Sequence, residues 1–331
     1  MNLPIAALTT LLSFVLTGLA LVYARRTGLI DVPGERHSHS VATPRGGGAG
    51  LVLALVVMAV APVGNQLPNA VHTVVLPGFV VLALLGWLDD HWPLKARIRF
   101  VIQLLVCIFL VWSLPRGGPF DAPWLALAAV LFAAWMINLY NFMDGSNGLA
   151  AGQGVFAALV LAWLFQRAGA PGYAALGLLA AASCIGFLPW NLGRARVFMG
   201  DVGSLALGFL FAALILYGVA GAAFSLPVGL MVMSLFLADS TLTLLHRVSR
   251  GERWYNAHRQ HLYQRLIMRG WTHGSVLLLY QSINLVVVLP AIVFGVSRPE
   301  WAWPVAIALA AVLVLAWYLS LRRIGVLAAA R

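Results

Sequence analysis

Long apolar runs alternate with short polar segments from one end of the chain to the other. Most runs approach the length of about 20 residues that a helix needs to cross a hydrocarbon core. We count eleven of them, or ten if one of the shortest does not cross the bilayer. The runs cover Leu3–Tyr23, Gly46–Pro62, Val71–Leu88, Phe100–Leu114, Trp124–Tyr140, Leu149–Phe165, Tyr173–Trp190, Leu205–Ala220, Leu226–Leu245, Ser275–Val296 and Trp301–Leu321. The pattern predicts an all-α, polytopic membrane protein, with residues 1–331 forming one integral-membrane domain.

The loops between these runs differ in charge. Eighteen of the 21 lysine and arginine residues lie after odd-numbered runs or in the C-terminal tail, and the exceptions are Arg116, Arg167 and Arg298. Because cytoplasmic loops carry an excess of Lys and Arg, this side is predicted to be cytoplasmic and the N-terminus to lie outside. The net charge of +11 therefore reflects orientation in the membrane and requires no nucleic-acid partner.

Composition supports the same class of protein. A mean hydropathy of +0.91, with 62% hydrophobic and 9% charged residues, excludes an ordinary soluble domain. The first run is too long for the core of a signal peptide and has no basic segment before it, so we expect a retained span. Cys107 and Cys184 lie inside apolar runs, where we expect reduced packing residues and no disulfide.

The segment 138–150, NLYNFMDGSNGLA, lies where two apolar runs meet, and polar side chains there are costly unless they have a function. Its amide and acid residues occupy every third position: Asn138, Asn141, Asp144 and Asn147. A continuous helix would spread them over half its surface, but the two glycines allow the backbone to leave helical geometry and gather them. We expect a metal-assisted phosphate-transfer site here. Taken alone, Asp144 also fits a turn, and Asn138 an interhelical hydrogen bond.

Three further acids lie on the same predicted side. Asp89 and Asp90 end the third run, and adjacent helical residues point about 100° apart, so the pair forms one clamp only if the helix ends there. Neighbouring carboxylates repel, and Mg²⁺ with substrate phosphates would neutralise them; the alternative is a solvated helix end paired with Lys95 or Arg97. Asp201, in FMGDVGS, lies just before the eighth run. We expect it either to bind a ligand or to cap the helix that follows.

The longest loop on that side contains His258 and His261, which we expect on one helical face, with Arg259 between them. Arg and His together suit a diphosphate group. The alternatives are a zinc site, which would lack a defined third ligand, and a basic amphipathic loop resting on lipid.

Two weaker candidates complete the set. Asp239 lies inside the ninth run, either as a site residue or as the acceptor of a buried hydrogen bond from a neighbouring span. The first loop, DVPGERHSHSVATPRGGG, brings Asp31, Arg36, His39 and Arg45 together with three glycines, a composition suited to phosphate.

In this order the segments resemble the polyprenyl-phosphate N-acetylhexosamine-1-phosphate transferases of glycosyltransferase family 4, relatives of the phospho-N-acetylmuramoyl-pentapeptide transferase. The resemblance extends from about Asp31 to Tyr263. The first loop is similar to D-x-P-x-x-R-x-x-H…P-T-P-R-G-G-G, the two acids of the third run to the double-Asp motif, segment 138–150 to the Asn-rich DG motif, and FMGDVGS to the Gly-Asp-x-Gly-Ser motif.

Three features depart from the family pattern: Asn147 where an acid is frequent, Pro93 at a position charged in some branches, and HRQH in place of three histidines. The segment AHRQHLYQRL is most similar to enzymes that initiate O-antigen or similar surface polysaccharides. A peptidoglycan or teichoic-acid branch of the family is the alternative.

The resemblance implies transfer of N-acetylhexosamine-1-phosphate from UDP-N-acetylhexosamine to undecaprenyl phosphate, with release of UMP. It implies Mg²⁺ as cofactor, with Mn²⁺ as a substitute, and the bilayer, both substrates and a second copy of the chain as partners. The location would be the bacterial cytoplasmic (inner) membrane, with the active site on the cytoplasmic side.

It also implies roles for individual residues. Asp89 would deprotonate or orient the lipid phosphate, Asp201 and Asp90 would hold the metal, and Asp144 would act on the nucleotide side. The expected substrate-binding residues are Arg45, Asn138, Asn141, Asn147, Asp239, His258, Arg259 and His261. Direct attack by the lipid phosphate and a covalent phospho-aspartate both stay open.

Two other classes of protein compete with this interpretation. A proton-coupled transporter would place its binding groups near the bilayer midplane, often within inverted repeats, whereas here only Asp239 lies deep. A non-catalytic scaffold would not need paired acids and paired histidines.

Overall fold

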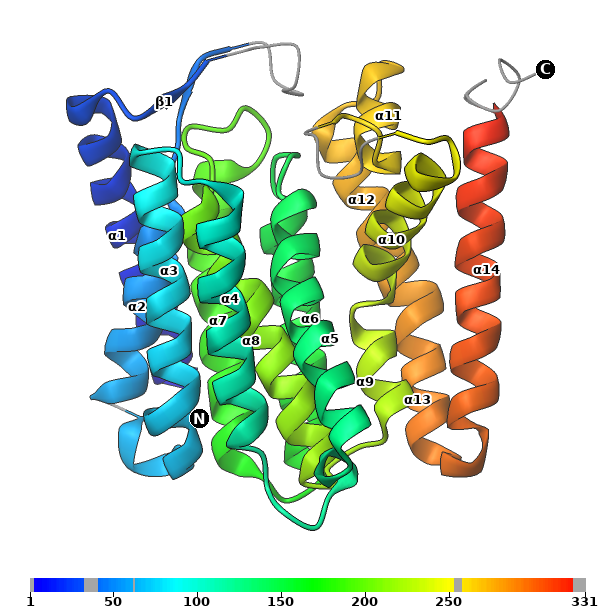
Figure 1. Cartoon of the computed structure of the whole chain (residues 1–331). Helices are drawn as coiled ribbons and strands as arrows, with labels where there is room; N and C mark the ends of the chain where they lie inside the picture. Colours follow the sequence, from blue (N-terminus) through cyan, green and yellow to red (C-terminus); the bar gives the residue numbers. More distant parts are fainter. Residues whose placement is uncertain (1–2, 33–40, 62, 253–257, 324–331) are drawn as a thin grey trace.

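The computed structural model describes residues 3–32, 41–61, 63–252 and 258–323. Within these residues the α-helices are α1 (Leu3–Thr27), α2 (Gly48–Val60), α3 (Leu76–His91), α4 (Ala96–Trp112), α5 (Pro123–Phe142), α6 (Leu149–Arg167), α7 (Pro171–Asn191), α8 (Asp201–Ala220), α9 (Leu226–Val232), α10 (Ser234–Ser249), α11 (Leu262–Met268), α12 (His273–Ile283), α13 (Leu289–Ser297) and α14 (Ala302–Arg323). Strand β1 (Ile30–Asp31) pairs antiparallel with β2 (Thr43–Pro44), a small addition to the predicted all-α class. The long helices stand side by side, with α1 starting at the lower end of the bundle and α14 ending at the upper end (Figure 1).

Short helical turns of other types complete the described elements. The π-helices η2 (Val71–Val75) and η4 (Asn284–Val288) run directly into α3 and α13, and the 3-10 turns η1 (Gly64–Gln66), η3 (Pro119–Asp121) and η5 (Pro299–Trp301) lie in connections.

The helices have the length and composition of membrane spans. In the described part of the chain eight helices meet both criteria, and nine do so if α9 and α10 count as one bent span. Helices α2 and α4 are shorter, at 13 and 17 residues. Each predicted run overlaps one or more helices, so the chain is a multi-pass membrane protein. The count of eleven crossings and the orientation stay predictions.

The ninth predicted run departs most from a straight helix. It breaks at Met233, where α9 and α10 meet at an angle of 79°. Backbone carbonyls released by a break inside a membrane need other donors, and Nε2 of Gln153 in α6 donates to the carbonyl of Val232 (3.3 Å). The break directs α10 toward the end of the bundle at which α11 lies.

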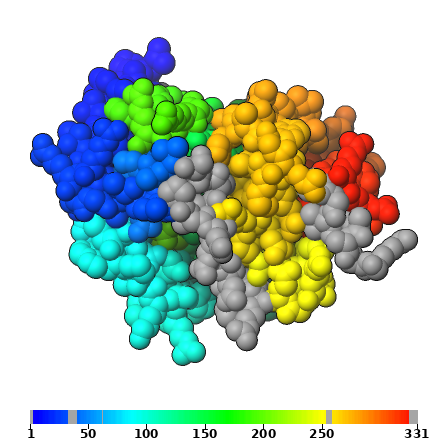
Figure 2. Space-filling model, turned by 90° about the horizontal axis from the view of Figure 1, so that it is seen from above, coloured from blue at the N-terminus to red at the C-terminus, as the bar shows by residue number. Residues whose placement is uncertain are grey.

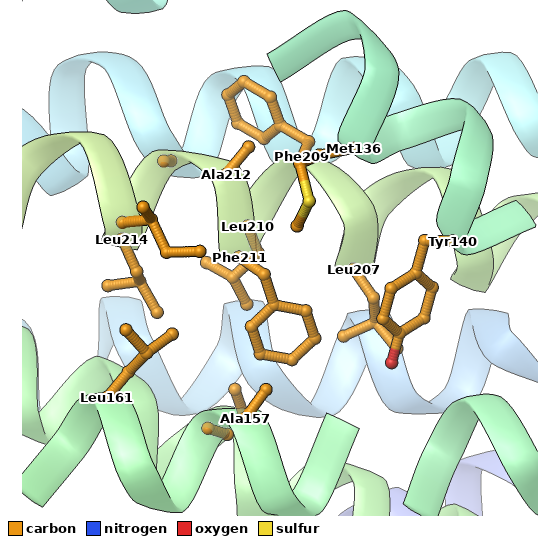
Figure 3. Packing of buried hydrophobic residues seen from close by; sticks show 14 of the residues in the cluster. Met136, Tyr140, Ala157, Leu161, Leu207, Phe209, Leu210, Phe211, Ala212 and Leu214 are labelled. Carbon is orange, nitrogen blue, oxygen red and sulfur yellow. The ribbon is translucent and has the colours of Figure 1, made fainter. Parts of the chain in front are cut away.

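Helix α8 forms the centre of the bundle and is buried along nearly its whole length. Phe211 of α8 packs against Tyr140 of α5 (Figure 3), whereas Phe209 packs against α3. Gly208 lets α8 approach α5 closely, because a Cβ at this position would lie 2.7 Å from the carbonyl oxygen of Met136. Small residues at close helix contacts are a usual means of association inside membranes.

The connections after α1, α3, α5, α7 and α10 all lie at the upper end of Figure 1, which we call the acidic end because Asp90, Asp144 and Asp201 lie there. Seen from this end, the α3–α4 region (cyan) and the α10–α12 region (yellow to orange) lie on opposite sides of the molecule (Figure 2).

Candidate active site

A cavity of about 700 Å³ lies at the acidic end, between segments that are far apart in the sequence. Its polar lining includes Asp31, Arg45, Asp90, Arg99, Asn138, Asn141, Asp144, Asn147, Asn191, Asp201, His258, His261 and Gln264. Most of the residues singled out from the sequence therefore meet around one space.

The end of α3 is joined to the start of α8 through Asp90. Its Oδ1 accepts a hydrogen bond from the N–H of Asp201 and its Oδ2 one from Val202, both at 3.3 Å, so this buried carboxylate caps α8. Two glycines make the approach feasible: a Cβ at Gly86 would overlap the Asp201 carbonyl, and Gly200, with φ of +75°, leaves room for the carboxylate. These contacts explain why α8 begins at Asp201, four residues before the predicted Leu205.

The guanidinium of Arg99, in α4, joins two of the acids. Its Nη1 donates to Oδ2 of Asp89 and lies 3.4 Å from Oδ2 of Asp201. The other oxygen of Asp89 accepts from the N–H of Leu94 (2.7 Å), and Oδ1 of Asp201 accepts from Nδ2 of Asn141 (2.8 Å). Asp89 and its neighbour in α3 thus have separate partners, and the pair does not form one clamp.

The loop after α5 carries Asp144 into the cavity. Helix α5 ends at Phe142, and Gly148, with φ of +76°, directs the chain into α6. Burial raises the pKa of Asp144 well above its usual value, and the charges of Asp201 and Asp90 raise it further, against a backbone hydrogen bond from Gly200. A cation bound beside these acids would reverse this shift and favour the charged form.

The two histidines also line the cavity, but their predicted place on one helical face is wrong. Helix α11 begins only at Leu262, so His258 and His261 both precede it, although their ring centroids are 4.9 Å apart. Burial, the neighbouring imidazole and nearby arginines lower the pKa of His258 to about 3, and burial is the largest cause that lowers the pKa of His261. Both shifts favour the uncharged imidazole, which can donate and accept hydrogen bonds.

The donor set fits Mg²⁺ better than a structural metal. Among the described residues no three His, Cys, Asp or Glu side chains are grouped as a metal site. Mg²⁺ is usually bound by one or two carboxylates together with substrate phosphates, so Asp201 and Asp144 offer what it requires once a phosphorylated substrate is present. The zinc alternative for the histidines receives no support from the described residues.

The cavity also has an apolar side, where Leu131, Trp135 and Leu244 contribute to its wall. A second groove, of about 210 Å³, shares Trp135 and Leu244 with it and continues along Leu245 and Val248 of α10. The side chains of these last two residues are more than half exposed, on a surface that faces outward from the bundle. The polar cavity therefore adjoins an apolar groove between α5 and α10.

Comparison with known proteins identifies the family of the chain. The family model described as glycosyl transferase family 4 matches residues 72–219. The decaprenyl-phosphate N-acetylglucosaminephosphotransferase of Mycobacterium leprae (strain TN) is 31% identical over 86% of this chain and 82% of its own. The chain belongs to glycosyl transferase family 4.

Two other relatives in this family extend over similar lengths. The probable undecaprenyl-phosphate N-acetylglucosaminyl 1-phosphate transferase of Bacillus subtilis (strain 168) is 28% identical over 88% of this chain and 85% of its own. The undecaprenyl-phosphate alpha-N-acetylglucosaminyl 1-phosphate transferase of Escherichia coli (strain K12) is 28% identical over 94% and 90%.

In this family 4 chain, nine of the twelve predicted site residues line the cavity: Arg45, Asp90, Asn138, Asn141, Asp144, Asn147, Asp201, His258 and His261. The other three, Asp89, Asp239 and Arg259, are not part of its lining. Arg36 and His39 of the first loop lie outside the described residues. Asn138 also makes the interhelical hydrogen bond considered for it, from Nδ2 to Oε1 of Gln103 in α4 (2.9 Å).

Sequence reasoning assigned no role at the site to Arg99 or His273. Arg99 lies one helical turn before Gln103. Two polar residues on one face of a largely apolar helix could have indicated that this face lines the site. His273, at the start of α12, lies 3.0 Å from Oγ of Ser146 through Nδ1, and nothing in its surroundings in the sequence indicates that contact.

Proposed function

We propose that this family 4 member transfers N-acetylhexosamine-1-phosphate from a UDP-N-acetylhexosamine to undecaprenyl phosphate, with release of UMP. One observation supports it above the others: acids and arginines from five distant segments converge in one cavity that adjoins an apolar groove. Water-soluble and lipid substrates need that combination. The relatives' names, each of which includes a polyprenyl phosphate and N-acetylglucosamine, support the same reaction.

Catalysis of this transfer depends on positioning the phosphates and neutralising their charge. Arg45 and Arg99 face the cavity and would bind phosphate oxygens of the donor and the acceptor. Asp89 forms an ion pair with Arg99 and would fix the guanidinium in place. The guanidinium would in turn orient the lipid phosphate for attack on the β-phosphorus of the donor.

The metal belongs at Asp201, with Asp144 beside it. Bound there, Mg²⁺ would neutralise charge on the diphosphate oxygens. Asp90 is a weaker ligand than the sequence implied, because both of its oxygens already accept N–H bonds from the start of α8. Its role in the proposal is to fix Asp201 through the backbone.

The polyprenyl chain would leave the cavity through the groove between α5 and α10, along Trp135 and Leu244. The nucleotide would then occupy the side formed by the loop after α5, where Asn147 Nδ2 donates to the carbonyl of Gly193 (2.7 Å). We place the reaction at the start of O-antigen or similar surface-polysaccharide synthesis, on the cytoplasmic side of the inner membrane, with the peptidoglycan and teichoic-acid branches as alternatives.

The test is UMP release by purified protein in detergent with undecaprenyl phosphate and Mg²⁺. UDP-GlcNAc is the first donor to try, followed by UDP-GalNAc, UDP-QuiNAc and UDP-FucNAc. Lipid-dependent UMP release that stops after chelation with EDTA and returns with added Mg²⁺ is the expected result. Failure with every donor, in protein that remains folded, would rule out the proposed reaction.

A further inference from the structure

Asp239 is a buried acid of α10 that the proposed chemistry does not use. Its side chain is 3% exposed and is not part of the cavity lining. An unpaired carboxylate at such a position is costly, so its partners should explain its presence. Oδ1 accepts from the hydroxyl of Thr243 in the same helix (3.2 Å), and Oδ2 from the hydroxyl of Tyr280 in α12 (2.7 Å).

Asp239 also contacts the start of α11: Nδ1 of His261 lies 4.0 Å from its Oδ1, and the first two backbone N–H groups of the helix donate to it. Oδ1 accepts from Leu262 at 2.7 Å, and Oδ2 from Tyr263 at 3.3 Å. The first N–H groups of a helix have no acceptor within the helix, and a negative charge there is favourable. Asp239 therefore caps α11 from another helix, in addition to the local capping box that His261 makes with Gln264.

Helix α11 has seven residues, too few for a helix to be stable by itself. The position of α11 therefore depends on the contacts that its ends make with other parts of the chain. At its start are His261 and, three residues earlier, His258, which both line the cavity. An anchor on the first turn of α11 thus fixes the histidine wall of the cavity relative to the membrane helices.

The same helix contacts the acidic loop directly. The hydroxyl of Tyr263 donates to the carbonyl of Phe142, the last residue of α5 (2.8 Å). Gly145, next to Asp144, fits under this phenol, because a Cβ at position 145 would overlap the hydroxyl oxygen. A shift of α11 would therefore change both the histidine wall and the loop that carries Asp144.

We propose that Asp239 is a positioning residue of the transferase site: it fixes the start of α11, and through it the place of His258 and His261 against the bound diphosphate. The part of this proposal that is tested by enzyme activity rests on the proposed function. It replaces the prediction that Asp239 binds substrate, and it explains the acid in the ninth run through the contacts of both carboxylate oxygens.

The first test is a double-mutant cycle between Asp239→Asn and His258→Ala, measured by UMP release. Asparagine keeps the shape of the side chain but lacks the charge and the second acceptor oxygen. We expect each single variant to lower kcat at least about tenfold, with little change in KM for the UDP-sugar, because misplacement by about 1 Å is sufficient for such losses. Because both act on the same wall, the double variant should be no slower than the worse single variant.

The second test is hydrogen exchange, which needs no activity. In Asp239→Asn the amides of Leu262 and Tyr263 should exchange faster than in the unmodified protein, whereas peptides from α6 should be unchanged. If the unmodified protein releases no UMP, the proposed function fails, yet this measurement still decides whether Asp239 orders α11.

Two further variants complete the design. Tyr280→Phe removes one hydrogen bond from the carboxylate but keeps both of its N–H bonds to α11, so kcat should fall less than in Asp239→Asn. Leu262→Pro removes one N–H donor from the α11 side; proline is favoured at the first helical position, and His261 already has the extended backbone (φ −59°, ψ 147°) that a following proline requires. It should accelerate exchange at Tyr263 and lower kcat, and it carries the test if Asp239→Asn does not fold.

Multiplicative losses in the double variant would overturn the proposal, since the two residues would then act independently. Unchanged amide exchange in both Asp239→Asn and Leu262→Pro would overturn it equally, as would full activity in His258→Ala.

Discussion

Asp201 is the residue on which most contacts of the site converge: Asn141 binds one carboxylate oxygen, Arg99 approaches the other, and Asp90 accepts its N–H. Asp201→Asn should lower UMP release at least about 100-fold, because a neutral amide removes the proposed metal ligand while keeping the shape. The measurement is UMP release against Mg²⁺ concentration. Asp121→Asn, at the opposite end of the bundle, is the control and should stay within about twofold. Full activity of Asp201→Asn would remove Asp201 as a metal ligand.

Arg99 offers a second test at the scale of one residue. Arg99→Lys keeps the charge but cannot hold Asp89 and face Asp201 with one planar group, so kcat should fall about 10- to 100-fold, as for loss of one hydrogen bond to a charged group. Arg97→Lys, at an exposed position two residues earlier in α4, is the matched control. Equal rates for the two variants would show that the guanidinium of Arg99 has no special part in turnover.

Several single residues could be predicted from the sequence because membrane segments rarely contain polar groups without a reason. Asp90, Asn141, Asp144 and Asp201 all line the cavity, as that argument requires. The same argument does not identify Arg99, because the orientation of the protein in the membrane already accounts for basic residues on that side. Asp239 was recognised as unusual, but its contacts depend on α11, whose position the sequence does not specify.

At the scale of elements, the contact between α3 and α8 decides where two of the acids lie. Gly86→Ala should separate these helices, because the added methyl group would meet the Asp201 carbonyl, which belongs to the backbone and cannot rotate away. We expect a loss of about 1–3 kcal/mol in stability, the usual range for overpacking, and a fall in activity. Thermal unfolding and UMP release measure both effects.

Gly274→Ala is the control for this substitution. It is also a helical glycine, but the nearest atom to its added Cβ would be Oγ1 of Thr272 at 3.9 Å. Alanine there should leave stability unchanged or slightly raise it, because glycine is the poorer helix former. Equal stability losses in both variants would argue against the close approach of α3 to α8 as the cause.

The helices were predicted well from apolar runs, whereas breaks and short helices were not. Every predicted run is largely helical, because a segment that crosses a bilayer must be apolar and must satisfy its own backbone hydrogen bonds. The bend at Met233 has no proline to mark it, and its freed carbonyl is satisfied by Gln153 of another helix. Helix α11 could not be predicted from the local sequence either, since a carboxylate distant in the sequence caps its start.

For the whole molecule, the order of the helices brings five connections to one end, and the chemistry follows from that arrangement. Odd-numbered runs all end there, so acids separated by more than a hundred residues in the sequence meet at one end of the bundle. The groove between α5 and α10 then adjoins the cavity on the side that faces outward. A transporter would need binding groups near the middle of the bundle, whereas this cavity lies at one end.

We predict that the acidic end faces the cytoplasm, and the two buried cysteines allow this to be tested by cysteine labelling. Cys107 and Cys184 are both buried, so a single introduced cysteine can be read without replacing them. Lys95→Cys lies at the acidic end and Asp121→Cys in the connection between α4 and α5 at the other. With 18 of 21 basic residues on the acidic side, a membrane-impermeant maleimide should label Asp121→Cys in intact spheroplasts and Lys95→Cys only after permeabilisation. Labelling of Lys95→Cys in intact spheroplasts would place the cavity outside, away from any cytoplasmic nucleotide sugar, and the proposed reaction would lose its donor.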